Sequence, residues 1–263
     1  MRNHAARIVF AITIAVILIG ASAGQADATE ARSFKVKFAD CIEFVGVAPI
    51  DPSRADRLVP DRFVVASLFQ IPGGASIVVR VSDCDKVSVD DEPATRGTVA
   101  HIGININAPD GDGNINNYTL TYASNHRSLV EKLQRAGVPA EFDHGLVFEF
   151  TPTIAPAGEL YAAITTAQTP HWFVHGQTTG SYAPFPGTAP FVANWWRASG
   201  AAVTKMATTI KEIAFFDASG VSFFTARSNF IGHLIGGNTI TKFTELPVRG
   251  VFKQGEMVVT VRR

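Results

Sequence analysis

Apolar and polar residues alternate with a period of two along much of this chain, which is the pattern of strands that bury one face. The clearest case is the segment 98–107. One face of that strand would carry Ile102, Ile104 and Ile106. The opposite face would carry His101, Gly103, Asn105 and Asn107. We expect the isoleucines to face the core, and the polar, uncharged side to line a barrel lumen or a wetted pocket.

Similar alternation, or a run of β-branched residues, predicts further strands. They cover residues 29–40, 41–50, 63–69, 76–81, 118–122, 145–150, 159–166, 202–216, 221–224 and 257–261. The turn sequences at 217–220 and 253–256 predict hairpins. The segment 167–200, rich in proline, glycine and large aromatics, is predicted to be a long functional loop. The pattern predicts a mostly β protein, an antiparallel β-barrel or a double-sheet domain, with one or two short packed helices.

A helix is predicted at one place, where four apolar residues recur at helical spacing. They are Leu129, Val130, Leu133 and Ala136. The helix can be capped by Ser124 or Asn125, or by a capping box of Ser128 and Glu131. Gly137 follows the last apolar residue and can take the left-handed conformation that ends a helix. A strand comes just before, so strand, helix and sharp stop follow one another.

This order of elements resembles the acetoacetate decarboxylase superfamily. In that family a strand with tyrosine leads into a short helix that ends in Gly-Phe-Pro-Lys, and the lysine forms a Schiff base with the substrate. Here the strand carries Tyr118 and Tyr122, and residues 137–140 read Gly-Val-Pro-Ala. The resemblance covers residues 41–149 and implies a β-rich domain around a pocket for a small molecule.

Two positions depart from the family pattern. Ala140 stands where the family has its lysine, and alanine cannot form an imine. Arg80 stands in a strand where the family has an acidic residue. The resemblance therefore implies a protein that binds a small, largely apolar ligand without Schiff-base decarboxylation, and no cofactor is expected. The candidate ligand-binding residues are Arg80, His101, Asn105, Asn107, Tyr118, Tyr122 and Ala140.

Two other classes of function stay open. An enzyme of another class could build its site from His101, His171 and His175. A non-catalytic envelope protein could use the aromatic loop as a contact surface, with Trp195 and Trp196 exposed. Assembly into a homo-oligomer is a further open alternative.

The N-terminal segment has the order of a secretory signal peptide. Two arginines give positive charge, residues 8–20 form an uninterrupted apolar run, and small residues follow. The run is shorter than the about 20 residues that a membrane span needs, although a retained anchor is the alternative. We expect cleavage after Ala23 or Ala28 and a secreted or periplasmic protein with no stable membrane span. Residues 1–28 would be the signal peptide, and residues 29–263 a single β-rich domain.

Composition narrows the partners and the redox state. The 263 residues are 46% hydrophobic and 17% charged, with a formal net charge of zero. This balance, without a basic cluster, argues against binding to nucleic acid. The chain has two cysteines, Cys41 and Cys84. In an oxidising compartment we expect a disulfide between them, and two buried thiols are the alternative.

Two weaker patterns bear on site chemistry. Oxygen-bearing side chains fall at alternate positions, as they do in calcium loops. These are Asp110, Asp112, Asn114 and Asn116. The sixth position is Ile115 instead of glycine and the twelfth is Thr121 instead of glutamate, so a plain turn is the favoured interpretation. Lys205 or Lys211, if it faced inward, could serve as a relocated amine nucleophile, but an outward, solvated lysine is the favoured interpretation.

Overall fold

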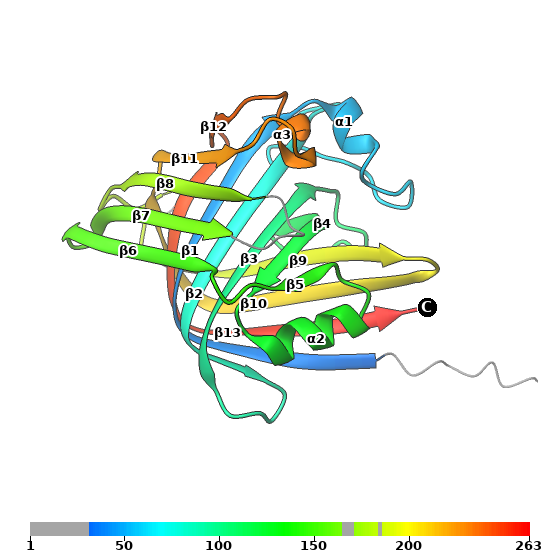
Figure 1. Cartoon of the computed structure of the whole chain (residues 1–263), viewed down its shortest axis with the longest axis horizontal. Coiled ribbons are helices and arrows are strands. Elements are labelled where there is room, and N and C mark those ends of the chain that lie inside the picture. The colour runs from blue at the N-terminus through cyan, green and yellow to red at the C-terminus, as the bar shows by residue number, and fades with distance from the viewer. Residues whose placement is uncertain (1–31, 165–170, 184–185) are drawn as a thin grey trace, which may run out of the picture. The chain divides into compact units, whose positions relative to one another are not determined.

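Seven long strands close into a β-barrel in the computed structural model of the chain, which describes residues 32–164, 171–183 and 186–263 (Figure 1). They are β1 (Arg32–Ile50), β2 (Ala75–Val89), β3 (Thr95–Asn105), β4 (Ile115–Ser124), β9 (Thr188–Ser199), β10 (Ala202–Asp217) and β13 (Leu246–Arg262). Around the barrel the order is β3-β2-β1-β13-β10-β9-β4, and β4 pairs with β3 to close the ring. The β4–β9 pair is parallel and the other pairs in the ring are antiparallel. The predicted signal peptide lies outside the described residues.

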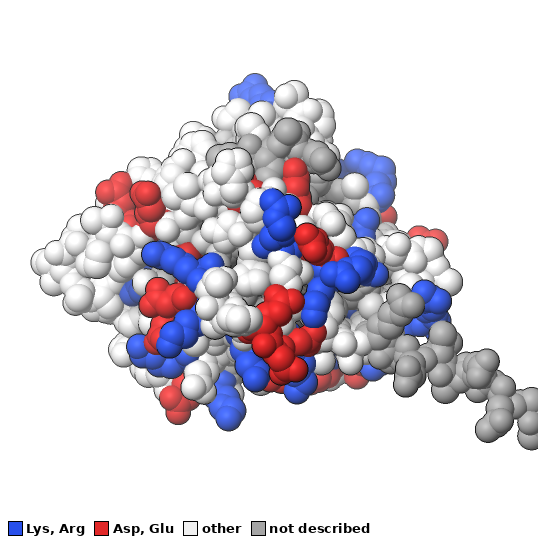
Figure 2. Space-filling view, turned by 60° about the horizontal axis from the view of Figure 1, so that its bottom comes forward, with Lys and Arg blue, Asp and Glu red and all other residues white. Residues whose placement is uncertain are grey.

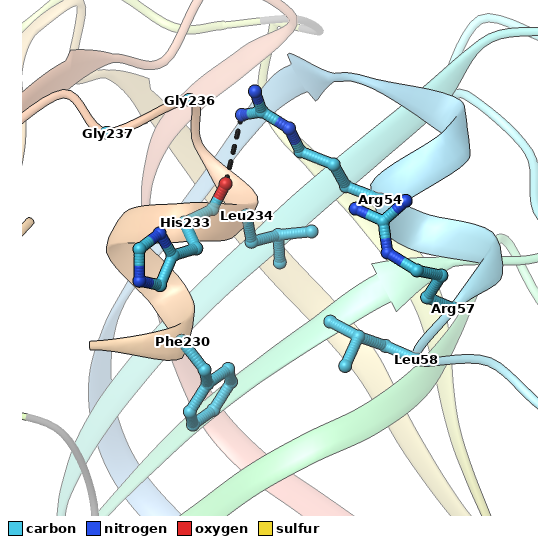
Figure 3. Close-up of a pocket in the computed structure, with 8 residues that line it drawn as sticks. All are labelled: Arg54, Arg57, Leu58, Phe230, His233, Leu234, Gly236 and Gly237. Carbon is cyan, nitrogen blue, oxygen red and sulfur yellow. Dashed lines mark hydrogen bonds between the residues drawn. The ribbon is translucent and has the colours of Figure 1, made fainter. Parts of the chain in front are cut away.

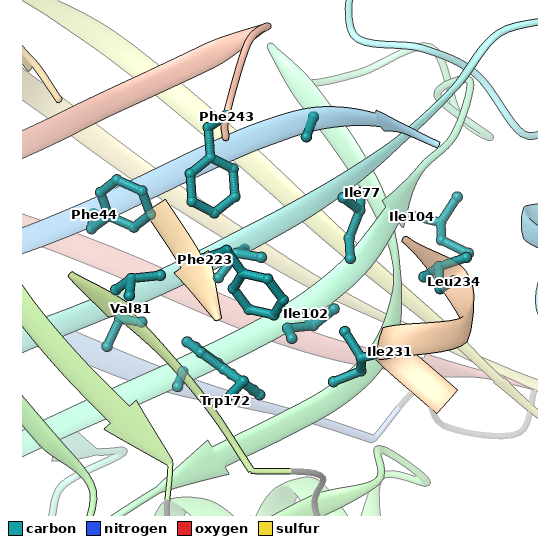
Figure 4. Packing of buried hydrophobic residues seen from close by; sticks show 14 of the residues in the cluster. Phe44, Ile77, Val81, Ile102, Ile104, Trp172, Phe223, Ile231, Leu234 and Phe243 are labelled. Carbon is teal, nitrogen blue, oxygen red and sulfur yellow. The ribbon is translucent and has the colours of Figure 1, made fainter. Parts of the chain in front are cut away.

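A second sheet packs over one side of the barrel (Figure 1). Its strands are β6 (Val147–Ile154), β7 (Ala157–Ile164), β8 (Trp172–Thr178), β11 (Gly220–Thr225) and β12 (Ile240–Lys242), in the order β12-β11-β8-β7-β6. Figure 4 shows Trp172 and Phe223 of this sheet packed against Ile77, Val81 and Ile102 of the barrel. The isoleucine face of β3 is therefore buried between two sheets, as its alternation predicted.

A separate cluster of apolar side chains fills the barrel lumen. Because side chains alternate along a strand, Val78 of β2 belongs to the lumen cluster while its neighbours Ile77 and Val79 belong to the core between the sheets. The helix α2 (Arg127–Arg135) packs Leu129 and Leu133 against the lumen cluster. The short strand β5 (Ala140–Phe142) follows the helix and pairs in parallel with β4. The predicted helix and its neighbouring strand thus adjoin the lumen.

The described chain contains three helices, and the two others have five residues each: α1 (Pro52–Asp56) and α3 (Phe230–Leu234). The predicted cap of α2 is wrong. His126 caps the helix, because its Nδ1 accepts a hydrogen bond from the Leu129 backbone N–H at 3.3 Å. Ser124 still belongs to β4, where its hydroxyl donates to the carbonyl of Thr98. Gly137 has φ of +81°, so the predicted helix stop is confirmed.

Four segments differ from the prediction. The described part of 167–200 is not a long loop, because it contains the whole of β8 and β9. The turn at 217–220 leads from β10 in the barrel to β11 in the second sheet, so it joins no hairpin. The predicted hairpin at 253–256 is wrong, since β13 runs through it and pairs with both β1 and β10. Residues 63–69 form one isolated bridge instead of a strand.

A disulfide joins two neighbouring strands of the barrel. Cys41 of β1 lies directly opposite Cys84 of β2, with a Cα–Cα distance of 4.1 Å and an S–S bond of 2.08 Å. Both residues are 1% exposed and belong to the lumen cluster. The predicted bridge is therefore confirmed.

A buried arginine ties the barrel to the second sheet. The guanidinium of Arg249 on β13 lies between the rings of Phe150 and Phe216, 4.4 and 4.5 Å from their centroids. Its Nη2 donates to the carbonyl of Pro156 at 2.7 Å. Burial lowers the pKa of Arg249 to about 10, so the group stays charged at neutral pH. A cation stacked on two aromatic faces explains how this charge is accommodated in the interior.

Charges of both signs are mixed on the surface. On the face shown in Figure 2, basic and acidic side chains lie interspersed among uncharged ones. Ion pairs such as Arg96–Asp83, at 2.7 Å, join opposite charges near the surface. Among the helices of the described residues, none has the length and apolar character to cross a membrane.

Candidate functional site

A buried ion pair is the strongest polar feature of the barrel lumen. Arg80 on β2 donates a hydrogen bond from Nε to Oε2 of Glu43 on β1 at 2.9 Å, and its Nη2 lies 2.7 Å from the same oxygen in an ion pair. The two side chains are 6% and 1% exposed. Gly250 of β13 lies opposite Glu43 and leaves room for it, because a Cβ there would lie 2.8 Å from Glu43 Cγ. The two charges neutralise each other in an interior that would strongly disfavour either one alone.

A small cavity lies beside this pair. Its volume is about 20 Å³, which is room for about one water molecule. Its polar lining residues are Glu43, Arg80, Asn117, Trp195 and Thr208, and its other lining residues are apolar. Phe191 is the one lining residue that is partly exposed, while the others are buried. Phe191 is therefore the part of the described cavity wall that reaches solvent.

Several polar atoms around the cavity have no hydrogen-bond partner within the described part of the chain. Three of them belong to lining residues: Asn117 Nδ2, Trp195 Nε1 and Thr208 Oγ1. The same holds for both ring nitrogens of His101 and for the hydroxyl of Tyr122. The His101 ring centroid lies 4.5 Å from that of Trp195 and 4.1 Å from that of Tyr122, so these groups adjoin. Buried polar groups are nearly always hydrogen-bonded, and these donors suit a ligand oxygen.

The titratable rings of this group are held neutral. Burial lowers the pKa of His101 well below its ordinary value, and the charge of Arg80 lowers it further. Burial raises the pKa of the Tyr122 phenol, against the attraction of Arg80 for the phenolate. At neutral pH both side chains therefore offer hydrogen bonds and not charge.

Ala140, which the sequence resemblance matches to the family's lysine, carries only a methyl group. Ala140 begins β5, pairs with Tyr122 of β4 and belongs to the lumen cluster. The buried residues of the described chain include no lysine. Lys205 binds the carboxylate of Asp110 at 2.6 Å, and Lys211 is exposed. Neither of the two lysines considered as relocated amines enters the lumen.

The structure divides the other predicted ligand-binding residues. Asn105 is buried and donates to the carbonyl of Asn116 at 2.9 Å and to Oδ1 of Asn117 at 3.3 Å. Tyr118 belongs to the core between the sheets, and Asn107 is exposed beyond the end of β3. The lumen thus brings together five of the seven predicted residues, and Tyr118 and Asn107 lie outside it.

Four polar residues of the cavity wall were not predicted to lie in the lumen. They are Glu43, Asn117, Trp195 and Thr208. A signal existed for Glu43, because it lies two residues after Cys41 and alternation puts both on one face. Trp195 was expected in a loop, and its burial depends on β9 also pairing with β4, which is distant in sequence.

The oxygen-rich loop does not assemble a calcium site in this structure. Lys205 Nζ lies 2.6 Å from Asp110 Oδ2 and 3.5 Å from Asp112 Oδ2. Asn114 Oδ1 accepts a backbone N–H of β9, and Asn116 Oδ1 accepts the N–H of a tryptophan of β9. The described residues hold no cluster of three or more His, Cys, Asp or Glu side chains that could bind a metal ion. These oxygens serve structural contacts instead.

The structure separates the three histidines of one alternative site and buries the two tryptophans of the alternative contact surface. His101 is buried on β3, whereas His171 and His175 are exposed on the second sheet or just before it, so the three histidines do not form one site. Trp195 and Trp196 are 1% and 4% exposed. The exposed tryptophans that would have favoured the contact-surface alternative are therefore not observed.

Comparison with solved structures identifies the fold. The enduracididine biosynthesis enzyme MppR complexed with pyruvate matches with a TM-score of 0.55 and 13% identity, over 94% of this chain and 96% of that chain. Acetoacetate decarboxylase from Legionella pneumophila matches with 0.55 and 9%, over 87% of each chain. An acetoacetate decarboxylase-like enzyme from Sphingomonas wittichii matches with 0.53 and 10%, over 87% of this chain and 90% of that chain. The chain therefore has the acetoacetate decarboxylase-like fold, as the sequence resemblance predicted.

No protein-family model matches the sequence, and no curated protein matches it. The likeness to the solved structures is thus one of fold, and the chemistry has to be argued from the residues of this chain.

Proposed function

We propose that this protein is an exported, acetoacetate decarboxylase-like barrel protein that binds a small, largely apolar carbonyl compound in its lumen without forming a Schiff base. The observation that carries the proposal is the group of unpartnered donors beside the cavity, above all Asn117 Nδ2 and Trp195 Nε1. Two such donors suit one carbonyl oxygen, and the remaining apolar wall suits a short hydrocarbon group.

Charge favours a neutral ligand over an anion. The guanidinium of Arg80 already binds Glu43, so the lumen offers no free cation to a carboxylate. Bringing an anion next to Glu43 would add an uncompensated charge in a buried space. MppR, which has the same fold, is known in complex with pyruvate, so pyruvate is the natural charged probe to set against a neutral ketone such as 2-butanone.

A cavity of about 20 Å³ is too small for such a ligand. We therefore expect the Phe191 side chain to move aside when the ligand enters. Replacing Phe191 by alanine should widen the cavity and speed binding. Phe173→Ala is a matched control, since Phe173 is 38% exposed on the second sheet and lines a different pocket.

Binding can be followed by the fluorescence of Trp195, which lines the cavity. We expect 2-butanone to change the tryptophan emission of the wild-type protein and to do so at lower concentration than pyruvate. Trp195→Phe keeps the ring packing and removes the N–H, so the change should be lost. An unchanged emission in both wild type and Phe191→Ala, at any ketone concentration, would rule out lumen binding.

The absence of Schiff-base chemistry is tested by borohydride reduction in the presence of acetoacetate. The imine needs an amine in the pocket, and Ala140 offers none. We expect an unmodified protein mass. A covalent adduct on Lys205 or Lys211 would contradict this part of the proposal.

Export is supported by the order of charged, apolar and small residues before Thr29 and by the Cys41–Cys84 disulfide. N-terminal sequencing of the exported protein should give a start after Ala23 or Ala28. A mature chain that begins at Met1 would be evidence against the signal peptide.

A further inference from the structure

A second pocket lies away from the lumen, between the two short helices α1 and α3. Figure 3 shows that its lining residues come from both helices and from the residues just after each of them. Its volume is about 470 Å³, which falls in the range of about 300–1,000 Å³ that is usual for small-molecule sites. This pocket is much larger than the lumen cavity and needs no side chain to move before a ligand can enter.

The charge of the pocket is positive. Arg54 and Arg57 line it, and none of the described residues that line it is acidic. Neither arginine forms an ion pair with any residue that the structure describes. The nearby carboxylate of Asp51 is engaged at the start of α1, where it accepts hydrogen bonds from the backbone and hydroxyl of Ser53. Two guanidinium groups are therefore available to an anion.

Arg54 is held in place for such a contact. Its Nη1 donates to the carbonyl of His233 at 2.9 Å, which fixes the guanidinium across the space between the helices (Figure 3). Gly236 lets the chain pass close by, because a Cβ there would lie 3.2 Å from Arg54 Nη1 and its φ is +87°. A guanidinium has five N–H donors, so the donors that His233 does not use can bind an oxyanion. Holding the group in advance lowers the entropy that a ligand must overcome.

The opposite part of the pocket is apolar. Leu58 and Phe230 are each 38% exposed, and Leu234 is buried beneath them. In Figure 3 the Leu58 and Phe230 side chains approach each other below the arginines. An amphipathic anion would pair with the cations and cover the partly exposed apolar side chains beside them.

We propose that this pocket binds an organic anion that has a carboxylate or phosphate at one end and a short apolar group at the other. The anionic group contacts Arg54 and Arg57, and the apolar group packs on Leu58 and Phe230. The site is separate from the lumen and does not depend on the function proposed for it.

The test uses the full mature protein and three probes in isothermal titration calorimetry: phenyl phosphate, inorganic phosphate and benzyl alcohol. Phenyl phosphate carries both parts of the ligand, whereas the other two probes carry one part each. We expect phenyl phosphate to bind about tenfold more tightly than inorganic phosphate, from partial burial of its ring. Equal affinity of the two phosphates would overturn the proposal.

Two variants with matched controls assign the site. Arg57→Gln should weaken phenyl phosphate binding by about fivefold or more, while Arg262→Gln, at another exposed arginine, should leave it unchanged. Phe230→Ala should remove most of the difference in affinity between phenyl phosphate and inorganic phosphate. Phe173→Ala, at an equally exposed phenylalanine, should leave this difference unchanged. Wild-type affinity in Arg57→Gln would also overturn the proposal.

The anion can come from a soluble metabolite or from a lipid headgroup. Co-sedimentation with vesicles of phosphatidylcholine, with and without phosphatidic acid, separates these sources. Arg57-dependent sedimentation with phosphatidic acid assigns a lipid headgroup. Phenyl phosphate binding without sedimentation assigns a soluble anion, and either result supports the site.

Discussion

Removing the charge of Arg80 should destabilise the folded protein strongly. Its guanidinium makes a hydrogen bond and a close ion pair with one oxygen of Glu43, and the side chains are 6% and 1% exposed. At an effective dielectric constant of about 20 and about 4 Å, such a pair attracts with about 4 kcal/mol. Arg80→Met leaves the carboxylate buried without its partner, so we expect a loss of about 3–5 kcal/mol in the free energy of unfolding.

The double variant Glu43→Gln with Arg80→Met separates this effect from general damage to the core. Both charges are then gone, and we expect it to be more stable than Arg80→Met alone by about 2 kcal/mol. Urea unfolding of the wild type, both single variants and the double variant, with the disulfide intact, gives the four free energies. Strictly additive losses, or a wild-type midpoint in Arg80→Met, would show that the pair is not coupled as argued.

Three further predictions concern stability. Wild-type stability should fall as the pH drops below about 6.5, because the unfolded chain binds a proton at His101 there while burial keeps the folded form neutral. The slope from this group is at most about 1.4 kcal/mol per pH unit, and His101→Gln should remove it in urea titrations at several pH values. Replacing Cys41 and Cys84 by alanine should cost about 3–4 kcal/mol by freeing a loop in the unfolded chain, and an unchanged urea midpoint would contradict this. Arg249→Met should cost about 2 kcal/mol through its lost carbonyl contact and ring stacking, and a loss below about 0.5 kcal/mol would show that other contacts hold the sheets together.

The parts of the fold that sequence predicted are those where local pattern and tertiary environment agree. The alternation around Ile102 and His101 was enough to predict a strand with one face in the core and one in the lumen, because both faces of β3 are buried in different surroundings. The stop at Gly137 also follows from local backbone chemistry alone. The cysteine pair could be predicted because the chain offers no other partner for either residue.

The failures occur where long-range pairing overrides a local signal. The Lys253-Gln254-Gly255-Glu256 sequence has the composition of a turn, yet β13 continues through it because β1 and β10 pair with it on both sides. Gly255 is accommodated there because the Phe252 and Ile210 side chains fill the space beside it. The β9 strand was hidden by its glycine-rich and proline-rich surroundings, and with it the cavity residue Trp195.

The proposed ligand preference of the lumen depends on the ion pair, and one substitution should reverse it. In the wild type, Glu43 neutralises Arg80, and for this reason we expect a neutral ketone to be preferred over pyruvate. Glu43→Gln would leave the guanidinium buried without a counter-charge, next to the cavity that both residues line. A carboxylate ligand would then supply the missing charge, and its binding to the folded state would stabilise the variant by mass action.

We therefore expect pyruvate to raise the melting temperature of Glu43→Gln and to leave that of the wild type unchanged, while 2-butanone shows the opposite preference. Combining Glu43→Gln with Arg80→Met removes the guanidinium and should abolish the response to pyruvate. Differential scanning calorimetry at fixed ionic strength measures all three proteins. If pyruvate stabilises the wild type as much as Glu43→Gln, the lumen does not select ligands by the state of this ion pair, and its preference must come from the donors of Asn117 and Trp195 alone.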